Sequence, residues 1–67
     1  MVVTANDVIK FFRSKGYKAR RVEVVQAADA IAEYINMSNN YMDEGYTIEE
    51  WYNDTKFNYP EELNIFR

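Results

Sequence analysis

The 67-residue chain has no cysteine and no histidine, and it contains only one proline and two glycines. Disulfides and thiol nucleophiles are therefore excluded, as are zinc-finger and iron–sulfur sites, which need cysteine or histidine ligands. Two glycines are too few for a glycine-rich phosphate loop. A core of this size rarely supplies more than about 3–5 kcal/mol of stability. We expect one small domain over residues 1–67, without metal or cofactor, that depends on close helix packing, a partner or self-association.

Carboxylates are the remaining residues from which an active site could be built. Adjacent pairs occur at Asp43/Glu44, Glu49/Glu50 and Glu61/Glu62. Neighbouring carboxylates on a helix point in different directions, and general-acid catalysis needs a cleft that shifts a pKa. We do not expect so short a chain to form such a cleft, and the sequence therefore predicts a protein that is not an enzyme.

Long apolar runs are also missing. Val2 and Val3 are soon followed by the polar Asn6 and Asp7, so the start of the chain has no signal-peptide core. No window approaches the roughly 20 apolar residues of a membrane-spanning helix. These features predict a cytoplasmic protein with no membrane partner.

Charge is present but unevenly distributed. The formal net charge is −3, yet residues 1–22 carry six basic residues and one acidic residue, a net charge of +5. Residues 23–67 carry two basic and ten acidic residues, a net charge of −8. The two parts of the chain therefore form an electric dipole along the sequence.

Helix signals begin near the start of the chain. Thr4 is a good N-cap, and Asp7 stands at the third helical position, where a negative charge suits the helix dipole. Apolar residues recur at helical spacing up to Phe12, and Gly16 is a typical stop. A first helix is predicted over about residues 5–15.

The stretch from residue 17 to residue 25 has two interpretations. Its valines are β-branched and would suit a short strand, but a helical stripe of apolar residues runs through them to Ile35. We favour a helix that starts at about residue 20. The asparagines after Ile35 would end it near residue 37, whereas the apolar spacing continues towards Gly45, and we favour a long helix to about residue 44.

A third helix is predicted by Thr47-Ile48-Glu49-Glu50, which matches a capping box. Pro60 stands where a further helical turn could begin, and the apolar Leu63 and Phe66 are expected to dock on the core. The sequence thus predicts an all-α fold, a small three-helix domain with a short C-terminal helical turn. The alternative is a small α+β fold with a short strand near residues 17–25.

The basic run between residues 10 and 21 has the composition of a phosphate-contacting patch. Its candidate nucleic-acid contacts are Lys10, Arg13, Lys18, Arg20 and Arg21. The pattern resembles a helix-turn-helix in part, because Gly16 lies at the turn, the apolar Tyr17 follows it, and Val22 falls where a second helix packs on the first. It departs from that motif at Phe12, where the motif has a small residue. The resemblance implies a small DNA-binding regulator; the ordinary alternative is a solvated helix end.

Acidic and aromatic residues crowd the second half of the chain, with eight aromatics between Tyr34 and Phe66. Tyrosine and tryptophan anchor many protein interfaces, and arrayed carboxylates can imitate the phosphates of a nucleic acid. We therefore predict a contact surface for another protein with a basic surface. Its residues are Tyr41, Asp43, Glu44, Tyr46, Glu49, Glu50, Asp54 and Tyr59. The ordinary alternative places the acids in solvent and assigns to the core Ile48, Trp51, Tyr52 and Phe57.

A line of residues beside the main apolar stripe of the second helix predicts self-association. It consists of Ala27, Ala30, Tyr34, Met37 and Tyr41. Small side chains let a second helix approach closely. A symmetric antiparallel homodimer would also place the basic end of one chain against the acidic end of the other.

The leading functional hypothesis is a non-enzymatic regulator that binds and inhibits another protein. Seven asparagines and six tyrosines are typical of a low-GC coding source, in which compact phage-type inhibitors are common. The alternatives are the DNA-binding regulator and a self-assembling structural subunit.

Overall fold

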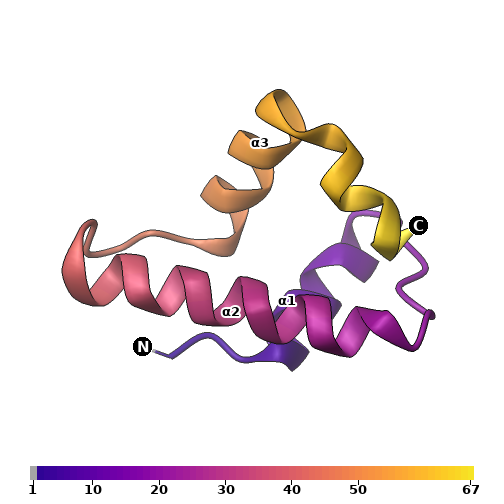
Figure 1. The fold of residues 1–67 in the computed structure, drawn as a ribbon, viewed down its shortest axis with the longest axis horizontal. Helices are drawn as coiled ribbons and strands as arrows, with labels where there is room; N and C mark the ends of the chain where they lie inside the picture. Colours follow the sequence, from indigo (N-terminus) through magenta and orange to yellow (C-terminus); the bar gives the residue numbers. More distant parts are fainter. Residues whose placement is uncertain (1) are drawn as a thin grey trace.

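The computed structural model describes residues 2–67, which form α1 (Ala5–Ser14), α2 (Glu23–Tyr41), α3 (Ile48–Asn58) and the 3₁₀-helix η1 (Pro60–Phe66). No strand occurs in this part of the chain, so the predicted all-α fold is confirmed and the alternative strand near residues 17–25 is wrong. In Figure 1, α2 forms the base, α1 packs beside it, and α3 stands above it. η1 then descends and brings the C-terminus beside the connection between α1 and α2. Among the described helices, none is long and apolar enough to cross a membrane.

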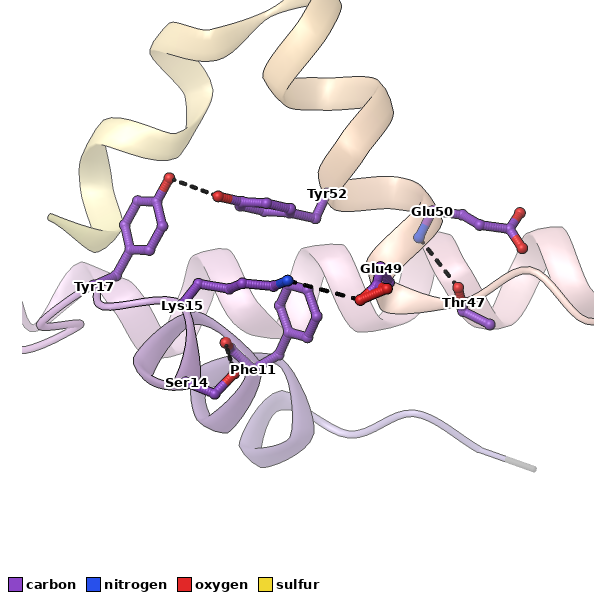
Figure 2. A network of polar contacts seen from close by, with 8 residues as sticks. All are labelled: Phe11, Ser14, Lys15, Tyr17, Thr47, Glu49, Glu50 and Tyr52. Atoms are coloured by element: carbon purple, nitrogen blue, oxygen red, sulfur yellow. Dashed lines mark hydrogen bonds and ion pairs between the residues drawn. The ribbon is translucent and has the colours of Figure 1, made fainter.

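Local capping explains where the helices begin. The Thr4 Oγ1 accepts from the Asp7 N–H at 3.2 Å, and the Asp7 carboxylate accepts from the Thr4 N–H at 3.0 Å, so α1 has the complete capping box. At the start of α3, the Thr47 Oγ1 accepts from the Glu50 N–H at 3.1 Å (Figure 2). The return bond from Glu50 is absent within residues 2–67, so the second predicted box is half formed. Pro60 begins η1, as predicted.

The connection between α1 and α2 differs from the prediction. α2 starts at Glu23 rather than near residue 20, because the preceding backbone is held by tertiary bonds. Ala19 is buried with a φ of +49°, its N–H donates to the Phe66 carbonyl at 2.8 Å, and its own carbonyl accepts from Arg13 at 3.2 Å. Eight residues therefore separate the helices, whereas a helix-turn-helix has a turn of about 3–4 residues. The connection does not have the geometry of that motif.

The end of α2 lies at Tyr41, between the two predicted ends. The N–H groups of Met42 and Asp43 both donate to the Ser38 carbonyl, at 2.9 and 2.7 Å, so the helix closes with a widened final turn that contains an i→i−5 bond. A helix to residue 44 and a stop near residue 37 are both wrong. The asparagines do not break α2, because two of their side chains make tertiary bonds instead.

Asn36 and Asn39 fasten the two segments that flank the C-terminal half of α2. The Asn36 amide accepts from the Val3 N–H and donates to the Val3 carbonyl, both at 2.8 Å, which fixes the segment before α1. The Asn39 amide donates to the Tyr46 carbonyl at 2.9 Å and accepts from the Gly45 N–H at 2.7 Å. These bonds fold the chain after α2 back towards the start of α3.

Phe12 lies at the centre of the core. Its ring stacks on Phe66 with the ring centroids 3.8 Å apart and the planes 3° from parallel. Trp51 and Tyr52 of α3 meet the same ring edge-on at 6.1 and 5.7 Å. Phe12 and Phe66 are fully buried, so the expected docking of the chain's last residues is confirmed. The departure from the helix-turn-helix pattern at Phe12 thus has a structural reason, since η1 and α3 pack around this large side chain.

Candidate functional site

A cleft of about 400 Å³ lies between α2 and α3 and continues to the start of η1. Its walls come from Ala30, Ile31, Tyr34, Tyr46, Trp51, Asp54, Thr55, Asn58, Tyr59 and Glu62. We call this hollow the α2–α3 cleft. Its volume lies in the roughly 300–1,000 Å³ range of ligand sites, and its walls mix aromatic and polar groups. Most of its lining residues are exposed, so it is an open surface groove.

The aromatic rim of the cleft is positioned by the turn after α2. Asn39 binds the Tyr46 carbonyl, and the Thr47 cap then starts α3 immediately afterwards. The Tyr46 ring meets Tyr34 of α2 edge-on, with the centroids 6.4 Å apart and the planes at 75°. The two tyrosines therefore form a corner with two differently oriented aromatic faces.

Negative charge lines the α2–α3 cleft without a balancing cation. Asp54 and Glu62 contribute carboxylates, and none of the lining residues is basic. Within residues 2–67 the one ion pair joins Lys15 to Glu49 at 3.7 Å, on the side of α3 that faces α1. Burial, followed by the negative charge of Asp54, raises the pKa of Tyr46 above its ordinary value. Tyr46 is therefore partly desolvated, and the cleft beside it carries negative charge.

The raised pKa of Tyr46 predicts an alkaline loss of stability. A group whose pKa is higher in the folded protein stabilises it below the unfolded pKa, about 10 for tyrosine, and loses that contribution as the pH rises through the folded pKa. We expect Tyr46→Phe to reduce the fall in the free energy of unfolding between about pH 9 and pH 11.5. Urea unfolding of wild type and Tyr46→Phe at both pH values measures this fall in the free energy of unfolding. Equal losses in wild type and variant would contradict the effect.

The eight predicted contact residues do not form one surface. Tyr46, Asp54 and Tyr59 line the α2–α3 cleft. A second hollow, of about 1180 Å³, lies between the segment before α1 and the turn after α2, and its walls include Tyr41, Glu44, Tyr46 and Glu49. Asp43 and Glu50 are exposed and line neither hollow. Tyr46 alone among the predicted residues belongs to both.

Tyr34 and Glu62 belong to the α2–α3 cleft but were not predicted as contacts. Tyr34 lies seven residues before Tyr41, so the sequence already indicated that the two share one face of α2. No sequence signal indicated Glu62, because it reaches the cleft only through the path that η1 takes back towards α2. Trp51 was assigned to a core, and it is partly buried there while also lining the cleft. Phe57, assigned to the same core, is 79% exposed, so that assignment is wrong.

Figure 2 shows a polar and aromatic network that joins α1 and the residues just after it to α3. Lys15 reaches Glu49 and also lies 5.3 Å from the centre of the Phe11 ring and 5.7 Å from that of Tyr52. The hydroxyl groups of Tyr17 and Tyr52 are hydrogen-bonded at 3.2 Å. Glu49 is thus paired with Lys15, but its side chain is 60% exposed and remains accessible.

The predicted nucleic-acid contacts lie on α1 and on the connection that follows it. Lys10 and Arg13 stand on α1, and Arg13 supports the connection through its bond to the Ala19 carbonyl. The other three are exposed on the connection: Lys18, Arg20 and Arg21. None of the five takes part in an ion pair within residues 2–67.

The line predicted for self-association is largely exposed on α2. Tyr34, Met37 and Tyr41 are 56%, 53% and 81% exposed, whereas Ala27 packs partly against the core. Ala30 and Tyr34 also line the α2–α3 cleft. This line and the cleft are therefore neighbouring parts of one apolar and aromatic surface.

The described residues, 2–67, offer carboxylates and aromatic rings, but no group of three or more acidic residues among them is arranged to hold a metal ion. The α2–α3 cleft instead combines aromatic faces with two unpaired carboxylates. Comparisons of the chain with protein-family models, with curated proteins and with solved structures find no match.

Proposed function

We propose that this protein is a non-enzymatic regulator that binds another protein, one with a basic surface, through the α2–α3 cleft, and inhibits it. The observation that carries the proposal is the pairing of aromatic walls with the unpaired carboxylates of Asp54 and Glu62. Tyrosine and tryptophan bury a large area at low entropic cost and keep a polar group for hydrogen bonding. Unpaired carboxylates beside them favour a cationic partner.

The acidic residues outside the cleft extend its negative field. Asp43, Glu44 and Glu50 are exposed around the turn after α2 and the first turn of α3. Charges at the rim of an interface act mainly on the rate of association, because they steer a partner of opposite charge. In this proposal these residues guide the partner, and such an acidic array also resembles the phosphates that a nucleic-acid-binding protein would recognise.

Charge reversal inside the cleft tests the proposal. Immobilised wild-type protein is used to capture its partner from a lysate of the native host, and the bound protein is identified by mass. We expect Asp54→Lys/Glu62→Lys to weaken capture of that protein at least about tenfold, because two attractive charges become repulsive. The matched control is Asp29→Lys/Glu33→Lys, which changes the net charge equally on exposed parts of α2 outside both hollows.

The control variant should capture the partner as wild type does. Circular dichroism of both variants confirms that they remain helical. Undiminished capture by the cleft variant, or equal loss in both variants, would remove the α2–α3 cleft from the mechanism.

A second candidate function is nucleic-acid binding through Lys10, Arg13, Lys18, Arg20 and Arg21. The favouring observation is that these cations have no ion pair within residues 2–67. Phosphate contacts release counterions, so binding to duplex DNA should weaken steeply between low and physiological salt. The absence of binding even at low salt would exclude this candidate.

A third candidate is self-assembly along the exposed line of α2, which includes Met37 and Tyr41. A homodimer would cover these side chains. Because Ala30 and Tyr34 of the same line also form walls of the α2–α3 cleft, it would compete with partner binding there. A molecular mass that stays that of one chain at all concentrations in sedimentation would exclude it.

A further inference from the structure

Several aromatic side chains line the α2–α3 cleft. Tyr34, Tyr46, Trp51 and Tyr59 all line it, and the rings of Tyr34 and Tyr46 stand at 75° to each other. Aromatic faces carry negative electrostatic potential and attract cations placed over them. A flat cation can lie against one of these faces while a neighbouring ring closes the side of the site.

The two carboxylates approach the cleft from different elements. Asp54 stands in the middle of α3, and Glu62 lies in the first turn of η1. No basic residue lines the cleft, and neither carboxylate is paired within residues 2–67. Two acceptors on separate walls suit a ligand that carries several hydrogen-bond donors in one plane.

The geometry points to an arginine side chain of the partner as the ligand of the α2–α3 cleft, with its guanidinium against the tyrosine rings and hydrogen-bonded to Asp54 or Glu62. This inference rests on the proposed function. Arginine fits better than lysine for two reasons: its planar guanidinium stacks on aromatic rings and presents several donors, and it is less strongly hydrated than an ammonium group. The aromatic and carboxylate lining of the α2–α3 cleft, about 400 Å³ in volume, suits the first of these properties most directly.

Short peptides test this assignment independently of the partner. The probes are acetyl-Gly-Arg-Gly-amide, its lysine analogue of equal charge, and its neutral citrulline analogue of nearly equal shape. Trp51 is the single tryptophan and lines the cleft, so its fluorescence and its indole N–H resonance both report on occupancy. One side chain in a half-open site is expected to bind in the millimolar range. We expect saturable binding of the arginine peptide, and about tenfold weaker binding of the lysine and citrulline peptides.

The variant Asp54→Asn/Glu62→Gln keeps the shape of the cleft and removes its charge. It should bind the arginine peptide about tenfold more weakly, whereas Asp29→Asn/Glu33→Gln should bind it as wild type does. Equal binding of the arginine and lysine peptides, or no saturable change in either signal of Trp51, would overturn the assignment. If the arginine peptide does not bind selectively while Asp54→Lys/Glu62→Lys still weakens capture of the partner, the arginine assignment is wrong and the proposed function is retained.

Discussion

Replacing Phe12 with alanine is expected to leave most of the protein unfolded at 25 °C. Phe12 is fully buried and stacks on Phe66, and Trp51 and Tyr52 meet its edge. Deleting a buried phenylalanine ring costs about 3–5 kcal/mol, and a domain of this size rarely has more than about 3–5 kcal/mol in total. Far-ultraviolet circular dichroism during urea titration measures the loss.

Phe57→Ala is the matched control, because this ring is 79% exposed on the same small domain. A surface substitution of this kind changes stability by about 0.5 kcal/mol or less. A cooperative unfolding transition in Phe12→Ala that lies within about 1 kcal/mol of wild type would contradict the central place of Phe12 in the core.

The second large effect is expected from Asn39→Ala, which releases the turn after α2. The side chain binds the Tyr46 carbonyl and the Gly45 N–H, and it also donates to the Ile35 carbonyl. Loss of a polar group that satisfies partly buried partners costs about 1–3 kcal/mol. We expect the free energy of unfolding to fall by that amount, and hydrogen exchange of the backbone amides between residues 42 and 47 to become faster.

Asn40→Ala is the control for this variant. Asn40 is the exposed neighbour in α2, and its side chain makes no hydrogen bond within residues 2–67. Asn40→Ala makes the same change in helix propensity as Asn39→Ala, and this change slightly favours the helix. Unaltered exchange after residue 41 in Asn39→Ala would show that the turn does not depend on this side chain.

The parts of the fold that were predictable from the sequence are those that depend on neighbouring residues. The caps of α1 and α3 and the start of η1 follow from Thr4, Thr47 and Pro60, since each acts within one turn of its own helix. The apolar spacing likewise predicted that α2 continues through its asparagines. These signals are local, and the structure retains them.

The parts that were not predictable depend on contacts between distant residues. Ala19 adopts a positive φ because Phe66 and Arg13 hold its backbone, and no local pattern shows this. The alternative end of α2 near its asparagines is not adopted, because Asn36 binds Val3, far away in the sequence, and Asn39 binds Tyr46 in the turn that follows the helix. Local propensity was overridden by tertiary hydrogen bonds in each case.

The candidate site was likewise predictable only in part from the sequence. Acidic and aromatic composition directed attention to the second half of the chain, and Tyr46, Asp54 and Tyr59 do line one cleft. The remaining predicted contacts lie elsewhere, because the turn after α2 and the angle of α3 separate them. Glu62 enters the cleft only through the path of η1, and sequence spacing does not contain that information.

Hydrogen exchange of the complex between this protein and its captured partner tests the central claim most directly, because it locates the contact on the chain. Binding in the α2–α3 cleft should slow the exchange of amides in residues 46–62 relative to the free protein. Exchange in the connection between α1 and α2, residues 15–22, should stay unchanged. Slowed exchange confined to residues 15–22, with residues 46–62 unaffected, would contradict the assignment of the cleft as the binding surface.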